Sequence, residues 1–185
     1  VYDDADHADW THLATHARLL KAQHPEFEMW SRGGHARGGV ACADCHMAKI
    51  QVGTEEVSDH HVRSPLLNVE GACMGCHDGT KAELEKRVRE IQDATQELML
   101  RAEEAVRSLV VAVREAREGG VEDAALATAR DLHRRAQWRL DFVASENSMG
   151  FHAPQEAARL LGESIDLARQ GEISVLGARL PPDDD

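Results

Sequence analysis

The chain has 185 residues, of which 42% are hydrophobic but only 4% aromatic, which suits one helical domain whose core is small aliphatic side chains or is partly filled by a cofactor. The formal net charge of −12 argues against a nucleic-acid partner, because phosphate binding requires a basic surface. No apolar run approaches the roughly 18 residues that span a membrane, and the first residue is Val rather than Met, so we expect the chain to be part of a larger gene product.

Residues 1–80 are rich in Gly, His and Cys and contain few long periodic runs. We expect short helices joined by long loops in this region, with one helix from about Thr11 to Lys21. Loops of this length inside a compact domain usually need another group to order them. The region is therefore predicted to bind a cofactor.

Residues 81–118 show the clearest helical pattern. Thr80 is the expected N-cap, with Glu83 completing a capping box, and Gly119 and Gly120 are expected to end the helix. A helix of this length is about 57 Å long, which exceeds the width of a small domain. We therefore expect it to contact a second copy of the chain, with packing against residues 123–147 of the same chain as the alternative. Its apolar or small residues recur in alternating steps of four and three, a heptad seam, at Leu84, Val88, Ile91, Thr95, Leu98, Ala102, Ala105, Leu109, Ala112 and Ala116.

Two further helices are predicted at residues 123–147 and 154–170. Pro154 lies near the start of the second, where its missing N–H is harmless, and Gly171 is expected to end it. Residues 81–180 thus form a long-helix region, and residues 181–185 are expected to be a disordered tail. Since no alternating pattern of useful length predicts a strand, the predicted fold class is all-α.

All four cysteines lie in two Cys-x-x-Cys-His motifs, at residues 42–46 and 73–77. A Cys-x-x-Cys pair occurs in disulfides, thioredoxin-type redox sites, zinc sites and c-type haem attachment. The adjacent His favours haem, because both thiols reach one porphyrin edge while the next residue places an imidazole on the iron. A four-cysteine zinc ribbon is the main alternative, but it needs no His at these positions.

The motifs therefore predict two covalently attached haem c groups. Cys42 and Cys45 would hold one, with His46 as its proximal ligand. The other would be held by the second motif, whose residues are Cys73, Cys76 and His77. Residues 1–80 become a haem-binding region that precedes the long C-terminal helices. Because covalent attachment of haem c takes place outside the cytoplasm, we predict a periplasmic location.

Electron-transfer haems generally take a second axial ligand, often another His. His35 lies in a Gly-flanked loop that can approach a macrocycle, and His152 follows Gly150 and precedes a helix start, so both are good candidates. His133 sits beside two arginines within a helix, and we interpret it as solvated or hydrogen-bonded rather than as a ligand. The remaining candidates are His24, His60 and His61, while His7, His12 and His16 are interpreted as non-ligands.

Several stretches resemble, in the same order, parts of the pentahaem cytochrome c nitrite reductases, the ammonia-forming enzymes. The resemblance runs from about Asp9 to Gly171. It is to the C-terminal portion of that family, which carries its fourth and fifth haems. The matching stretches read LKAQHPEFEMW, GGHARGGVACADCHMAK, VSDHHVRSPL, ACMGCH, AQWRLDF and ENSMGFHAPQEAARLL.

The resemblance implies roles for individual histidines. His24 matches the distal active-site histidine, which hydrogen-bonds nitrite and helps to deliver protons. His35 matches the distal ligand of the haem on the second motif, and His152 that of the haem on the first. His60 matches a ligand to a haem bound by the N-terminal portion, with the neighbouring His61 as the alternative.

The resemblance also implies a reaction and its partners. Lys21, through its backbone carbonyl, and Gln23, through its side chain, match positions that hold a structural calcium. The family reduces nitrite to ammonium with six electrons, forms homodimers through long C-terminal helices and receives electrons from a membrane-associated or soluble cytochrome. The enzymes of this family have five haems and bind the catalytic haem through a motif that ends in Lys. No Cys-x-x-Cys-Lys motif occurs in this sequence. We therefore expect that haem, and the active-site Arg and Tyr, to belong to sequence outside this chain.

Three other functions stay open. The chain could be a dihaem electron-transfer protein that has inherited these motifs without catalysis of its own. It could instead belong to a related multihaem enzyme that acts on hydroxylamine or an oxidised sulfur compound. The last alternative is a zinc-binding interaction module, which an optical spectrum would distinguish from a haem protein.

Overall fold

The computed structural model describes residues 7–179 and shows a mostly helical fold, as predicted, with two small antiparallel sheets. The expected tail at 181–185 lies outside the described residues. Within those residues no helix is both long and apolar enough to cross a membrane. The elements in chain order are β1 (Trp10–Thr11), β2 (Arg18–Leu19), α1 (Glu26–Trp30), α2 (Gly34–Arg37), α3 (Cys42–His46), β3 (Lys49–Val52), β4 (Glu55–Ser58), a 3-10 turn (Pro65–Leu67), α4 (Val69–Cys73), α5 (Lys81–Glu118), α6 (Ala127–Ala144) and α7 (Pro154–Ala178).

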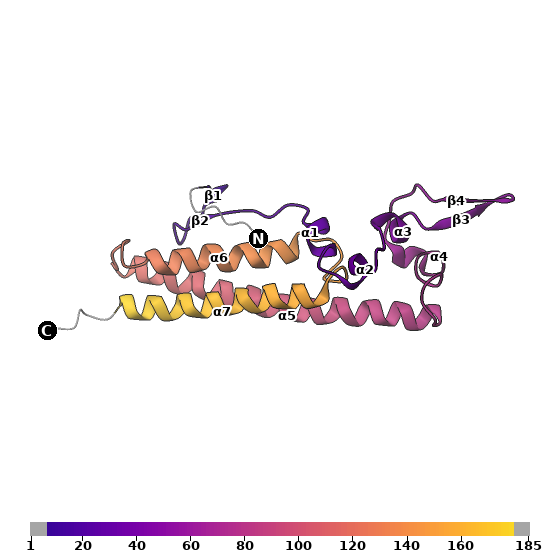
Figure 1. Cartoon of the computed structure of the whole chain (residues 1–185). Coiled ribbons are helices and arrows are strands. Elements are labelled where there is room, and N and C mark those ends of the chain that lie inside the picture. Colours follow the sequence, from indigo (N-terminus) through magenta and orange to yellow (C-terminus); the bar gives the residue numbers. More distant parts are fainter. Residues whose placement is uncertain (1–6, 180–185) are drawn as a thin grey trace.

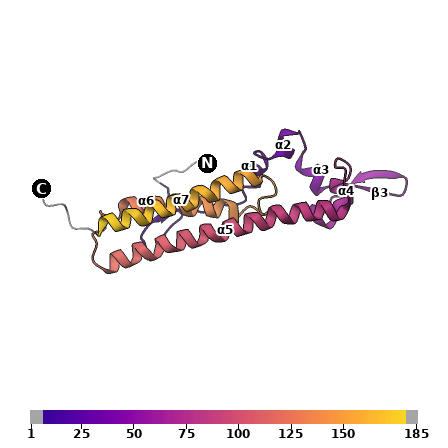
Figure 2. The ribbon, with the colours of Figure 1, turned by 90° about the horizontal axis from the view of Figure 1, so that it is seen from below.

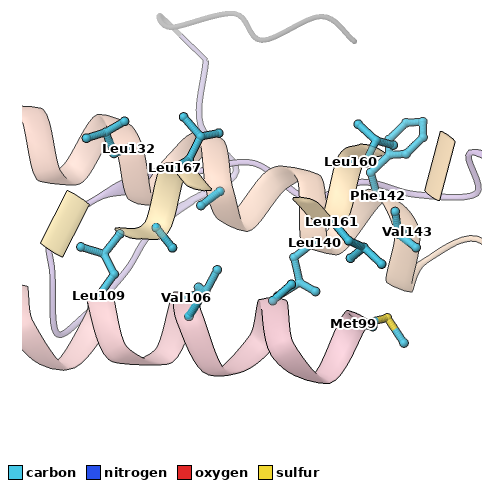
Figure 3. Packing of buried hydrophobic residues seen from close by; sticks show 14 of the residues in the cluster. Met99, Val106, Leu109, Leu132, Leu140, Phe142, Val143, Leu160, Leu161 and Leu167 are labelled. Carbon is cyan, nitrogen blue, oxygen red and sulfur yellow. The ribbon is translucent and has the colours of Figure 1, made fainter. Parts of the chain in front are cut away.

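The three long helices α5, α6 and α7 lie side by side and form a bundle (Figure 1). The first half of α5 runs past the start of α7 towards α4 and the β3–β4 hairpin, so the short elements gather at one end of the molecule (Figure 2). Val106 and Leu109 of α5 point towards side chains of the other two helices (Figure 3). Burial of this apolar stripe is the main driving force for packing the bundle.

Helix α5 has the predicted bounds. The backbone N–H of Thr80 donates to Glu83 Oε2 at 2.8 Å, and the N–H of Glu83 donates to Thr80 Oγ1 at 3.3 Å, which is the expected capping box. The helix ends at Glu118, before Gly119. Only the later part of its seam is buried within the chain, since Leu84 is half-buried whereas Leu109 is fully buried.

Helix α7 corrects one predicted end. It continues through Gly171 to Ala178 instead of ending there. A Cβ at Gly171 would meet the Leu109 side chain of α5 at 2.7 Å. This glycine therefore allows two helices to approach closely rather than terminating one of them. Helix α6 is also shorter than predicted, because turns occupy 123–126 and 145–149.

The predicted helix from Thr11 to Lys21 is wrong. The segment instead forms β1 and β2, in which Trp10 pairs with Leu19 and Thr11 with Arg18. The chain turns at His16, whose φ is +57°, and this left-handed backbone conformation interrupts a helix. We call residues 7–25 the strap, because they run along α6 (Figure 1).

The strap is held by polar side chains of the bundle that bond to its backbone. Arg117 donates to the carbonyl of Ala14, and Arg130 to that of Thr15. Asp141 accepts from the N–H of Ala22 at 2.7 Å. These partners lie more than a hundred positions away along the chain, so local sequence pattern gave no sign of them.

The β3–β4 hairpin was also not predicted. Its register pairs Val52 with Glu55, which leaves Gly53 and Thr54 as a two-residue turn. Gly-x between short runs that contain β-branched residues is a known hairpin signal. The hairpin projects away from the bundle at the end where α3 and α4 lie (Figure 1).

Candidate haem-attachment sites

The first cysteine motif forms α3, and the second begins at Cys73, the last residue of α4, which packs against α3. The four thiols, all within the described part of the chain, form no disulfide. The pKa of the Cys45 thiol is raised, first by burial and then by the nearby Cys73. The two motifs are therefore close together, although 26 residues separate them in the sequence.

His46 of the first motif faces His152, which lies just before α7. Their ring centroids are 6.2 Å apart, with 68° between the ring planes. The Nδ1 of His46 donates to the backbone carbonyl of Arg63 at 3.0 Å, and the Nδ1 of His152 donates to Glu146 Oε1 at 2.6 Å. Both Nδ1 atoms are thus occupied, which leaves each Nε2 as the nitrogen free to bind a metal.

His77 of the second motif faces His35 of α2 in a similar way. Their ring centroids are 6.0 Å apart, with 87° between the planes. The ring of Phe151 also lies beside that of His35, with ring centroids 6.0 Å apart. The same loop that carries His152 therefore also supports the second pair.

Both histidine pairs fit one haem iron each. A metal–imidazole bond is about 2 Å long and each Nε2 lies about 1 Å from its ring centre, so two imidazoles on one iron place their ring centres about 6 Å apart. The two observed separations match this value. Within residues 7–179 no three His, Cys, Asp or Glu side chains form a group that could hold a metal ion.

The residue before α2, the helix that carries His35, is in direct contact with the loop that carries His152. A Cβ on Gly33 would collide with the backbone carbonyl of His152. On the same side, Gln155 donates from Nε2 to the carbonyl of Arg32 at 2.9 Å. The position of His35 relative to His152 therefore depends on the absence of a side chain at Gly33.

Glu146 is a site residue that the sequence analysis did not single out. It is 1% exposed and accepts hydrogen bonds from His152 Nδ1, from the N–H of Ser148 at 3.1 Å and from Ser148 Oγ at 2.7 Å. Burial works to raise the pKa of this carboxyl, but the hydrogen bonds from His152 and Ser148 outweigh it and the pKa is lowered. Glu146 belongs to the stretch ENSMGFHAPQEAARLL, which resembles the family, but its role was not evident there. The turn over 145–150 brings its carboxylate into hydrogen-bond contact with His152.

His24 lies near the end of the strap, and the contact described for its side chain is with Glu26, at 3.8 Å. Its side chain is 85% exposed, and its φ of +50° is unusual for a residue with a side chain. Lys21 and Gln23 are also exposed. The strap is fixed here by Asp9, which accepts from the N–H of Lys21 at 2.8 Å. The catalytic role of His24 and the calcium role of its neighbours remain predictions.

The choice between His60 and His61 also remains a prediction. His61 bonds to Asp59 through both its backbone N–H and its Nδ1, the latter at 2.8 Å. Asp59 is buried and also accepts from Arg63 at 2.8 Å. His60 and His61 are both exposed, so either ring is open to a partner outside the chain.

The sequence predicted that His133 is either solvated or hydrogen-bonded. The structure shows that it is hydrogen-bonded and not solvated. It is fully buried, and its Nδ1 lies 3.2 Å from Thr15 Oγ1 on the strap. His12 stacks edge-on against it, with ring centroids 5.2 Å apart. Burial, with a smaller contribution from His12, lowers the pKa of His133 to about 4.

Comparisons with known proteins identify the family of the chain. The family model described as Cytochrome c552 matches residues 1–179. Cytochrome c-552 of Bacteroides fragilis is 40% identical over 174 residues, which are 94% of this chain and 35% of that protein. Cytochrome c-552 of Haemophilus influenzae is 37% identical over 166 residues, or 89% and 31% of the two chains.

A solved structure shares the fold. The catalytic subunit of cytochrome c nitrite reductase from Desulfovibrio desulfuricans ATCC 27774, for which two calcium sites are described, matches with a TM-score of 0.87 and 34% identity. The match covers 92% of this chain and 37% of that one, so the chain spans only about a third of the length of these relatives. On the strength of the match over nearly every residue, the chain belongs to the cytochrome c552 family.

Proposed function

We propose that this chain is the C-terminal portion of an ammonia-forming cytochrome c nitrite reductase and that it holds two of the five haems of that enzyme. One observation carries the proposal: each motif histidine faces a second histidine from a distant segment. His46 faces His152, and His77 faces His35. The solved nitrite reductase that shares the fold supports the choice of reaction.

Each residue set has a distinct task in this proposal. Cys42 and Cys45 hold one haem c and His46 with His152 close both of its axial positions. The second motif and His35 do the same for the other haem. Haems ligated by two histidines supply one-electron transfer and leave no position for substrate.

His24 is the residue proposed to act on nitrite. An imidazole can donate a hydrogen bond to a nitrite oxygen and pass on a proton near neutral pH. The bonds of Lys21 to Asp9 and of Ala22 to Asp141 fix the backbone that leads to it. Its exposed ring suits a pocket completed by sequence that also supplies the Lys-ligated catalytic haem. His60 is proposed to ligate a haem of that same sequence.

Calcium, location and electron donor complete the proposal. Lys21 and Gln23 would supply the carbonyl and amide oxygens that calcium prefers, and the relative of known structure has two calcium sites. Haem c attachment supports a periplasmic enzyme that receives electrons from a membrane-associated or soluble cytochrome.

The homodimer is proposed to use the outward face of α5. Leu100 is 53% exposed on this face. Further along the same face is a shallow hollow lined by Glu104, Arg107, Ser108, Val111, Ala112 and Glu115. The part of the seam around Leu109 is instead used inside the chain, against α6 and α7.

The test is haem content and spin state of the natively matured whole protein, by pyridine haemochrome assay and optical spectra. Replacing Cys42 and Cys45 by Ser should remove one haem per chain, and replacing Cys73 and Cys76 should remove another. His152→Ala should convert one low-spin haem to high-spin, while the control His7→Ala should change neither property. An unchanged spectrum in His152→Ala would refute the proposed ligand set.

Nitrite turnover separates the enzyme from the alternative, a dihaem electron-transfer protein. The whole protein should reduce nitrite to ammonium, and His24→Ala should lower that rate while haem content stays constant. A whole protein with only two haems, both low-spin, and no nitrite reduction would instead favour the dihaem alternative.

A further inference from the structure

We propose that Glu146 sets the basicity of His152 and, through it, lowers the reduction potential of the haem attached at Cys42 and Cys45. Glu146 would act as a positioning and tuning residue, because it contacts the ligand and not the haem. The inference rests on the proposed role of His46 and His152 as axial ligands.

The surroundings of Glu146 identify it as a carboxylate anion. It accepts from three donors: the Nδ1–H of His152, the N–H of Ser148 and the hydroxyl of Ser148. An ionised carboxylate is an acceptor only, so three converging donors match its charged form. Its side chain is 0% exposed, and water therefore does not screen the charge from His152.

The two histidines of this pair have unequal partners. His46 donates to a neutral backbone carbonyl at 3.0 Å, whereas His152 donates to a carboxylate at 2.6 Å. Hydrogen bonds to charged acceptors are shorter and about twice as strong as neutral ones. The proton on His152 Nδ1 is therefore drawn towards Glu146, which increases the electron density at Nε2 and makes the ring a more basic ligand.

A more basic ligand and a buried negative charge both favour the oxidised, more positively charged iron. The reduction potential of the haem at the first motif should therefore be lower than the same ligands would otherwise give. Within residues 7–179, the ring of His35 has aromatic contacts with His77 and Phe151 but no hydrogen bond to a carboxylate. Among the proposed ligands, Glu146 therefore polarises His152 directly, and its largest effect is expected at the haem of the first motif.

Glu146→Gln in the whole, natively matured protein is the direct test. The amide oxygen can still accept from His152, but the charge is lost. The midpoint potential of one low-spin haem should move to a more positive value in a spectroelectrochemical titration. One low-spin electron paramagnetic resonance signal should change its g values, and haem content should not change.

Glu156→Gln is the matched control. Glu156 lies in the first turn of α7, close in sequence to His152, but it pairs with Arg159 at 2.7 Å rather than with a ligand histidine. This variant loses the same charge and should shift the potential far less. A shift equal to that of Glu146→Gln, or no shift in either variant with haem content intact, would overturn the proposal.

Ser148→Ala provides an independent variant should Glu146→Gln fail to assemble. It removes the hydroxyl that donates to Glu146 and that also accepts from the N–H of His152 at 2.9 Å, but it leaves the carboxylate, so more negative charge is available to His152. The potential of the same haem should then move in the negative direction, and a positive shift or none would contradict the proposal. Failure of the proposed function is distinguishable, because it would appear in the wild-type protein as missing low-spin haem.

Discussion

At the residue scale, the histidines occupy three kinds of environment. Four of them form the two facing pairs, and His152 is the one oriented by a buried carboxylate. His24, His60 and His61 are exposed at the surface. His133 is fully buried behind the strap, where it contacts Thr15 and His12. The same type of side chain is thus a proposed ligand, a surface group or a core residue according to its surroundings.

The buried His133 predicts a pH-dependent stability. Its pKa is about 4 in the folded protein because burial disfavours the charged ring, whereas the unfolded chain has the ordinary value of about 6.5. The unfolded state therefore binds the proton first, and stability is lost as pH falls from about 6.5 to about 4. Between pH 7 and pH 5 the loss should be about 2 kcal/mol.

Urea denaturation of wild type and His133→Asn at these two pH values measures the effect. Asn retains a polar atom near Thr15 but does not titrate. Contributions from the other histidines are the same in both proteins, so the difference between the two pH slopes isolates His133. Equal slopes would show that its burial has no such effect.

At the scale of elements, the site is built from loops that meet, not from one continuous motif. The loop before α2 and the loop before α7 touch where Gly33 packs on the carbonyl of His152. The turn that ends α6 carries Glu146, while the cysteines lie on α3, at the end of α4 and in the turn that follows α4. Side-chain to backbone bonds fix the strap on α6. Each loop is therefore ordered by contacts to an element distant in sequence.

Gly33 and Gly34 offer a matched pair of substitutions. Gly33→Ala should separate the two loops, because its Cβ would collide with the His152 carbonyl. We expect a part of the low-spin haem signal to be lost, along with thermal stability. Gly34→Ala places its Cβ in open space and should leave both properties close to wild type. Identical behaviour of the two variants in optical spectra and thermal melts would contradict this account of the loop contact.

At the scale of the whole molecule, α5 has two uses along its length. Its second half packs in the bundle core, where Val106 is 5% exposed and Leu109 is 0% exposed. Its first half extends to the haem-attachment end (Figure 2). Its outward face carries Leu100 and the hollow near Val111. The heptad seam predicted a contact with a second chain, but its later part is buried inside the same chain, against α6 and α7.

Two substitutions in α5 separate these uses. Leu109→Ala leaves a cavity in the core and should cost about 2–5 kcal/mol of stability, without changing the oligomeric state of the folded protein. Leu100→Asp should convert the proposed dimer to a monomer in sedimentation velocity, because a charge would be buried at the contact. A dimer that persists in Leu100→Asp would exclude this face.

The sequence by itself determined the features that depend on neighbours in the chain. The cysteine motifs require only residues 42–46 and 73–77, and the bounds of α5 follow from Thr80, Glu83 and Gly119, whose capping interactions are local. The proposed partners His35 and His152 came from the resemblance to a family, since spacing left other histidines open.

Tertiary structure decided the features that join distant segments. The sequence pattern did not show that Gly171 admits a neighbouring helix, that residues 10–19 form a strap hairpin, or that Glu146 lies beneath His152. The physical reason is the same in each case. A close approach, a buried carboxylate or a backbone bonded by remote side chains gains its energy from contacts that exist only once the bundle has packed, and residue type and periodicity do not encode which segments will meet.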